Sequence, residues 1–122
     1  MGILALDHVQ LVMPAGREDE ARRFYGEYLG MTECPKPLNL RSRGGVWFQT
    51  SDCKVKVHLG VEKDFRAAKK AHPAFLVDDV MALGERIKQA GYEVIDDEPL
   101  EGYQRLYVYD SFGNRIELMQ RL

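Results

Sequence analysis

The chain has 122 residues, of which 45% are hydrophobic and 30% charged, and its formal net charge at pH 7 is −2. This length suits one domain, and the composition is too hydrophobic for a disordered chain. No run of about 18 apolar residues is present to cross a membrane. The slightly negative charge offers no broad attraction for a phosphate backbone, so nucleic acid is not an expected partner.

The N-terminal segment and the cysteines predict a cytoplasmic protein. Residues 1–6 lack the basic start of a signal peptide and lead directly into a strand pattern. Cys34 and Cys53 are the only cysteines, and their spacing matches no metal or redox motif. We therefore expect two reduced thiols rather than a disulfide, as is usual in the cytoplasm.

The first half of the chain predicts a strand, a helix and three further strands. Residues 6–13 carry apolar side chains at every second position, which is typical of a half-buried strand. Apolar and aromatic residues then recur at helical spacing over residues 21–29, and Gly30 ends that helix. The three following strands are predicted at residues 31–34, 46–50 and 55–61.

The second half repeats this order of elements. Residues 72–77 predict a strand, and Asp78 and Asp79 can cap a helix that Gly91 ends. Three more strands are predicted at residues 92–95, 103–109 and 116–119. A repeated unit of this kind predicts an α+β fold with two βαβββ modules, whose concave mixed sheets surround a cavity. Within a single domain, residues 1–122, the modules span residues 3–61 and 72–120, with a connector at 62–71.

Residues able to bind a metal occupy equivalent positions in the two modules. His8 and His72 start the first strand of each module, and His58 and Glu117 lie on the last strand of each. All three histidines of the chain belong to this set, and each residue lies on the polar face of its strand. If the modules pair around a pseudo-twofold axis, the four side chains can converge in the cavity.

Imidazole and carboxylate groups together suit Zn²⁺, Fe²⁺, Mn²⁺, Ni²⁺ or Co²⁺. Two histidines and one carboxylate leave coordination positions open for water or a chelating substrate. A lone strand histidine is more often a hydrogen-bonded residue than a metal ligand. Lys54 and Lys56 share the face of His58, so this face could be a solvated strand edge as easily as a metal site. The pattern predicts one divalent transition metal per site and leaves open whether His58 is a ligand or a neighbour of one.

Aromatic and cationic side chains predict a substrate-binding surface in the same cavity. The residues concerned are Trp47, Tyr103, Arg105 and Tyr107. Aromatic walls with one cation suit a small, partly apolar anion, which Arg105 would orient. Tyrosine also favours strands in general, so an ordinary polar sheet face is the alternative. Arg41 and Arg43, beside two glycines, predict either a mobile lid or a solvated turn.

Four segments carry a resemblance to a known family. They are Leu6-Asp7-His8-Val9, the helix end FYGEYLGM at 24–31, HPAFLVDD at 72–79 and DSFGNRIEL at 110–118. With these segments the chain resembles the vicinal oxygen chelate superfamily over nearly its whole length. That superfamily includes glyoxalase I, fosfomycin-resistance thiol transferases, extradiol dioxygenases and methylmalonyl-CoA epimerase.

The resemblance implies a metal held by concave sheets, where it binds vicinal oxygens of a small-molecule substrate. His8, His72 and Glu117 match the family's common set of two histidines and one glutamate. His58 falls where glyoxalase I has an additional carboxylate ligand, which is a departure from the glyoxalase I pattern. Single-domain members of this size are similar to proteins that dimerise by sharing modules, so we expect a homodimer with its sites at the interface.

These observations lead to two functions of different classes. The first is a metal-dependent enzyme of lyase, isomerase, thiol transferase or dioxygenase type, with Glu117 as a metal ligand and catalytic residue. The second is a non-catalytic protein that sequesters an antibiotic in an aromatic groove at residues 103–109. The complete ligand set favours the enzyme, because a drug-binding groove does not need one. A metal-binding module without an open position is a third reading, if His58 closes the site.

Overall fold

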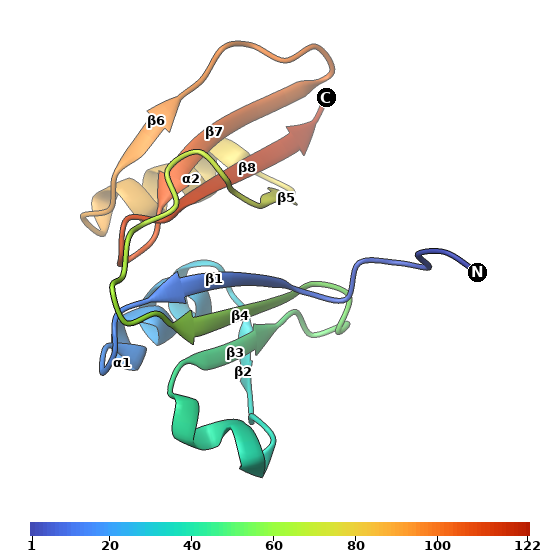
Figure 1. The fold of residues 1–122 in the computed structure, drawn as a ribbon. Coiled ribbons are helices and arrows are strands. Elements are labelled where there is room, and N and C mark those ends of the chain that lie inside the picture. The colour runs from blue at the N-terminus through green and yellow to red at the C-terminus, as the bar shows by residue number, and fades with distance from the viewer. The chain divides into compact units, whose positions relative to one another are not determined.

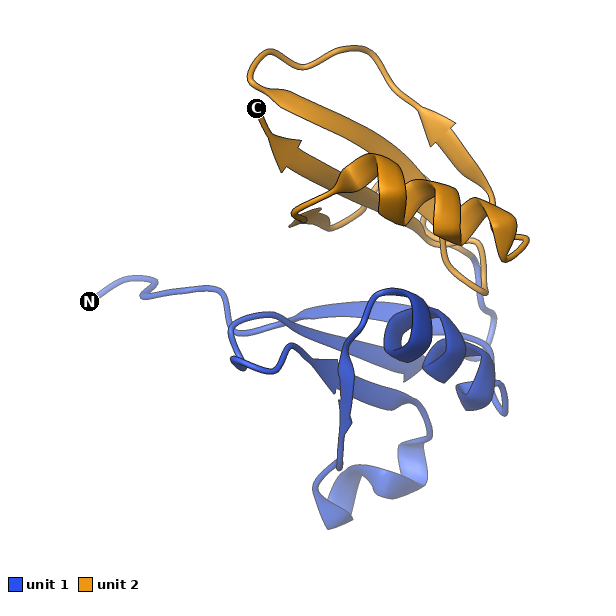
Figure 2. Cartoon of the chain, turned by 180° about the vertical axis from the view of Figure 1, so that it is seen from behind, with its two compact units in different colours: residues 1–66 blue, residues 67–122 orange.

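The computed structural model describes all 122 residues and divides the chain into two compact units, residues 1–66 and 67–122 (Figure 2). Each unit contains one four-stranded mixed sheet with helical segments against one of its faces (Figures 1 and 2). The α+β fold with two βαβββ modules is therefore confirmed. None of the helices has the length and apolar character that crossing a membrane would need.

The sheet of the first unit has the strand order β1-β4-β3-β2, in which β1 runs parallel to β4 and the other neighbours are antiparallel. Its elements are β1 (Val9–Met13), α1 (Glu18–Ala21), the π-helix η1 (Arg22–Tyr28), β2 (Thr32–Cys34), the 3-10 helix η2 (Leu38–Arg43), β3 (Val46–Gln49) and β4 (Lys56–Val61). The helical face is buried, with Met13, Phe24, Tyr25, Phe48 and Val57 almost fully covered. Alternation along the strands therefore leaves the opposite face for polar side chains.

Two local features of this unit differ from the sequence expectation. The first strand begins at Val9 rather than at residue 6, because its only neighbour, β4, pairs with it from Val57 onward. The segment before it is extended, and Ile3 and Leu4 are fully exposed. The helix η2 was not predicted, since residues 38–43 have no apolar periodicity, and it ends at Gly44 with a positive φ of 73°.

The sheet of the second unit has the order β5-β8-β7-β6, again with one parallel pair, β5 and β8. Its elements are β5 (Ala74–Leu76), α2 (Val80–Gln89), β6 (Val94–Asp96), β7 (Tyr103–Tyr109) and β8 (Arg115–Arg121). The predicted cap of α2 is present, because the Asp79 carboxylate accepts a hydrogen bond from the Ala82 N–H at 3.0 Å. Gly84 lets this helix approach Leu106 on β7, since an added Cβ would lie 2.8 Å from a methyl carbon of that leucine.

A buried polar turn connects the start of the second unit to its last strand. Asp110 accepts hydrogen bonds from the N–H groups of Phe112 and Asn114, each at 2.9 Å, and Asn114 accepts one from the Ala68 N–H at 3.0 Å. The Arg115 N–H also donates to the Ala68 carbonyl at 2.8 Å. Asp110 and Asn114 therefore hold the segment before β5 against the beginning of β8, which sets the register of residues 70–72 beside Glu117.

Candidate functional site

A row of four side chains crosses the sheet of the first unit on the face away from its helices. The strand register places Gln10 beside His58, His58 beside Trp47, and Trp47 beside Cys34. Neighbouring residues at the same register point to the same face of a sheet. Among the predicted site residues, this face brings together His58, Trp47 and, one step before β1, His8.

These three rings form a continuous stack. The ring centroids of His8 and His58 are 4.0 Å apart at an interplanar angle of 20°, and those of His58 and Trp47 are 3.9 Å apart at 4°. His58 is only 8% exposed. Burial, together with the nearby His8, lowers the pKa of His58 and favours its neutral ring. A neutral imidazole is the form that can offer a lone pair to a metal.

The other histidine of this unit is oriented by a carboxylate. His8 Nδ1 lies 2.9 Å from Asp7 Oδ2, and Lys56 Nζ lies 3.7 Å from the second oxygen of Asp7. The hydrogen bond from His8 and the charge of Lys56 both lower the pKa of Asp7. Because an ionised carboxylate only accepts, Nδ1 of His8 carries a proton, which in the neutral tautomer leaves the lone pair on Nε2. This is how a metal-ligating histidine is usually held.

In the second unit, His72 and Glu117 form the most informative pair of the site. His72 Nδ1 lies 2.8 Å from the Lys70 carbonyl, and Nε2 lies 3.0 Å from Glu117 Oε1. A carbonyl only accepts, so Nδ1 carries the proton, and Nε2 of a neutral ring would direct its lone pair at a carboxylate. A metal ion that both atoms ligate would satisfy the two lone pairs at once. The nitrogen and oxygen donors therefore fit a divalent transition metal.

The second oxygen of Glu117 is held by Arg105. Arg105 Nη1 lies 3.2 Å from Glu117 Oε2 and 3.2 Å from Asp97 Oδ2, and Nη2 donates to the Glu98 carbonyl at 2.8 Å. Its Nε is buried without a partner. Arg105 is predicted to orient a substrate anion, and in the structure its guanidinium contacts the carboxylates of Glu117 and Asp97. Its contacts are those of a residue that fixes the orientation of Glu117.

The tyrosines of β7 differ in their relation to this pair. Tyr107 is opposite Glu117 in the strand register, and its ring lies edge-on to His72 at 5.2 Å between centroids. Its hydrogen bond with Asp97 raises the pKa of Tyr107. Tyr103 lies at the other end of β7, opposite Arg121. The structure thus brings Tyr107 to the His72–Glu117 pair and leaves Tyr103 four residues along the strand.

Arg115 is a residue that the sequence reasoning missed. Its guanidinium carbon lies 4.4 Å from the Tyr107 ring centroid, and its Nη2 donates to the Tyr109 hydroxyl at 2.8 Å. Alternation would have found it, because Arg115 and Glu117 are two residues apart on β8 and so share a face. The Arg115 guanidinium therefore covers part of the aromatic surface that Tyr107 and Tyr109 form on β7.

The predicted metal ligands fall two in each unit, with His8 and His58 in the first and His72 and Glu117 in the second. Each pair is brought together by its own sheet, through the ring stack in the first unit and the direct contact in the second. Within each unit taken by itself, no three His, Cys, Asp or Glu side chains form a group that could hold a metal. Each unit therefore presents half of the predicted set.

A family model described as the Glyoxalase/Bleomycin resistance protein/Dioxygenase superfamily matches residues 5–118. The chain belongs to this superfamily. The matched region runs from the segment before His8 to just beyond Glu117, and it contains both modules. The resemblance inferred from the four sequence segments is thus confirmed.

Comparison with solved structures agrees with this assignment. A crystal structure of a glyoxalase family protein from Bacillus anthracis is 47% identical, with 100% of this chain and 98% of that chain covered and a TM-score of 0.91. FosX from Listeria monocytogenes, a fosfomycin resistance protein complexed with Mn(II) and sulfate, is 19% identical, with coverages of 99% and 93% and a TM-score of 0.79. TnmS3, an antibiotic binding protein from Streptomyces sp. CB03234, is 19% identical, with coverages of 100% and 99% and a TM-score of 0.75. No curated protein matches the chain.

Proposed function

We propose that this superfamily member is a metal-dependent enzyme that holds one divalent transition metal through His8, His72 and Glu117. The observation that carries this proposal is the contact between His72 Nε2 and Glu117 Oε1 at 3.0 Å, with Nδ1 of the same ring committed to a carbonyl. The orientation of His8 by Asp7 supports it, because both histidines then present Nε2. Zn²⁺, Ni²⁺, Fe²⁺, Mn²⁺ and Co²⁺ all suit such donors.

We further propose a cytoplasmic homodimer in which the two modules of different chains complete each site. Each unit supplies two of the four candidate residues, so neither unit alone holds the complete set. A partner chain would provide the missing half-set to each unit. Size-exclusion chromatography with light scattering, in the presence and absence of metal, measures whether two chains associate.

The chemistry proposed is that of a small oxygenated substrate bound through vicinal oxygens. The bound metal would supply a Lewis acid for these oxygens. Arg105 and His72 hold both oxygens of Glu117, so this carboxylate is fixed before the substrate arrives. His58 stands where glyoxalase I has a carboxylate, and burial lowers its pKa, which favours the neutral ring. The proposed reactions are the lyase or isomerase, thiol transferase and dioxygenase types of the superfamily.

The test is metal content per chain, measured by elemental analysis on protein purified without a histidine tag. We expect about one ion in the wild type and loss of the ion in His72→Ala and Glu117→Gln. Glu101→Gln, which removes an exposed carboxylate from the turn before β7, is the matched control and should keep the ion. Protein that stays free of metal after incubation with Zn²⁺, Ni²⁺, Mn²⁺ and Fe²⁺ would overturn the enzyme proposal. That result would favour a non-catalytic binding protein, the second candidate from the sequence.

A further inference from the structure

The face of the first unit that carries the ring stack also contains a cavity of about 240 Å³. Its floor is formed by Gln10, Trp47 and Gly60, and its wall by Lys36, Leu40 and Arg43 from η2 and the segment before it. Trp47 lines this cavity and also stacks on His58 at 3.9 Å. A ligand in the cavity would therefore lie next to the histidine rings of the proposed metal site.

Two glycines give this cavity its shape. Gly60 leaves room on β4 for the Gln10 amide, since an added Cβ would lie 2.6 Å from its Nε2. Gly45, with a φ of +85°, brings the loop after η2 against β4, where an added Cβ would lie 2.1 Å from the Leu59 carbonyl oxygen. The wall of the cavity is therefore anchored to the sheet by backbone packing.

The charges that line the cavity have one sign. Lys36 and Arg43 are its charged residues, and no carboxylate lines it. Lys36 donates a hydrogen bond to the Gly44 carbonyl, which holds the Lys36 ammonium group at the wall of the cavity. The other N–H groups of this ammonium remain available to a ligand. Arg43 is exposed, and its guanidinium makes no hydrogen bond or ion pair in the structure.

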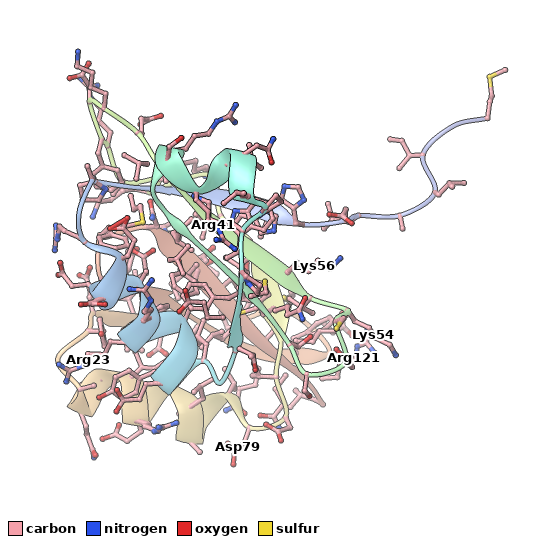
Figure 3. All side chains as sticks on the ribbon, turned by 90° about the horizontal axis from the view of Figure 1, so that it is seen from below. Arg23, Arg41, Lys54, Lys56, Asp79 and Arg121 are labelled. Carbon is pink, nitrogen blue, oxygen red and sulfur yellow. The ribbon has the colours of Figure 1, made fainter.

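The surrounding acidic groups do not neutralise these two cations. Glu18, the acid beside this loop, accepts from the Gly45 N–H at 3.1 Å and does not line the cavity. A second cavity of about 280 Å³ shares Lys36 and Trp47 with the first but has a different character, because its Arg22 is paired with Glu33 at 2.8 Å. Its remaining arginine is Arg41, which is labelled in Figure 3. Arg41 and Arg43 both belong to η2. The first cavity thus combines two available cations with an indole and a leucine side chain.

We propose that this cavity binds the oxyanion end, a carboxylate or a phosphonate, of a small, partly apolar substrate. Lys36 and Arg43 would bind the anionic oxygens, the Gln10 amide would donate a further hydrogen bond, and Trp47 and Leu40 would contact the apolar part. This inference rests on the proposed function and adds the substrate class. It also assigns Lys36, Leu40 and Arg43 a role in binding rather than that of a solvated turn.

Trp47 is the only tryptophan of the chain, so its fluorescence reports directly on the cavity. Metal-free protein in a chelator would be titrated with methylphosphonate, acetate and neutral acetamide at constant ionic strength. We expect a saturable change in emission with one or both anions and none with acetamide. Tighter binding of methylphosphonate would identify a phosphonate-type substrate, and tighter binding of acetate a carboxylate.

The variants Arg43→Gln and Lys36→Gln should each weaken binding of the anion by about five-fold or more. Arg41→Gln removes the same charge from the same helix but lines the other cavity, so it should bind the anion like the wild type. Gly60→Val, which fills the floor, should also abolish the fluorescence response. Circular dichroism would establish that each variant is folded.

Absence of a saturable response to either anion, or equal weakening by Arg41→Gln and Arg43→Gln, would overturn this inference. Because the titration uses metal-free protein, its outcome is independent of metal uptake. A protein that binds the anion but no metal would keep the cavity assignment and lose the enzyme proposal. The opposite result would keep the metal site and remove the anionic substrate.

Discussion

His72 Nε2 lies 3.0 Å from Glu117 Oε1, while Nδ1 of the same ring lies 2.8 Å from the Lys70 carbonyl. Both contacts come from the register of the second unit, since Glu117 pairs with Ala74 on β5 and its N–H bonds to the Pro73 carbonyl at 3.0 Å. A ring fixed in this way has one nitrogen left for a cation. The pairing of β5 with β8 thus places a nitrogen donor and an oxygen donor where one metal ion could contact both.

The first prediction concerns Glu117 itself. Glu117→Gln keeps the side-chain shape but removes the negative charge, so affinity for Zn²⁺ should fall by more than about 100-fold. Competition with a chromophoric chelator measures this affinity. Metal-free Glu117→Gln should remain folded, because a glutamine amide can donate to His72 Nε2 and needs no cation. An unchanged zinc affinity would exclude Glu117 from the ligand set.

The second prediction tests the carboxylate behind His8. Asp7→Asn replaces the acceptor of the Nδ1 proton by a neutral amide, and metal affinity should fall by about 10- to 100-fold. Asp52→Asn is the matched control, because Asp52 is exposed in the same unit and bonds only within its own turn. Equal affinities for the two variants in the chelator competition would show that Asp7 does not orient His8.

The third prediction separates the two roles of His58 that the sequence leaves open. His58→Phe keeps an aromatic ring between His8 and Trp47 but has no nitrogen donor. With His8, His72 and Glu117 as the ligands, we expect this variant to retain about one ion per chain with affinity within roughly ten-fold of the wild type. Loss of the ion would make His58 a fourth ligand.

The fourth prediction concerns the contacts of Arg105, which bridges Glu117 and Asp97. Lysine has a single point charge and cannot keep the forked geometry, so Arg105→Lys should lower the free energy of unfolding. Urea denaturation of the metal-free protein measures the change. Arg121→Lys, at the exposed end of β8, should be neutral. An equally neutral Arg105→Lys would contradict a positioning role.

The fifth prediction is a pH dependence at Cys34. Burial raises the pKa of this thiol, so the reactive thiolate forms at a higher pH in the folded protein than in the unfolded one. In a Cys53→Ser background, iodoacetamide should label Cys34 more slowly at pH 8 in buffer than in urea, and the difference should shrink as the pH rises. Equal rates at pH 8 would contradict the raised pKa.

Much of the fold follows from local pattern. Alternation predicted residues 103–109 as a strand, and the structure has β7 with the same bounds. Asp79 caps α2 as expected, and the ends of the helices at Gly30 and Gly91 both have positive φ values. These features depend on backbone conformation and on hydrogen bonds between near neighbours, which a short stretch of sequence specifies.

Other features depend on partners that are distant in the sequence. The start of β1 is set by the residue at which β4 begins. The end of η2 is set by the close packing of Gly45 on the Leu59 carbonyl. The contacts of Arg105 could not be read from its own strand, since Asp97 and Glu117 approach it from different elements. The order of polar and apolar residues determined which face each candidate ligand occupies. Only the tertiary structure decided which side chains share hydrogen bonds and charges across that face, because those contacts depend on strand register.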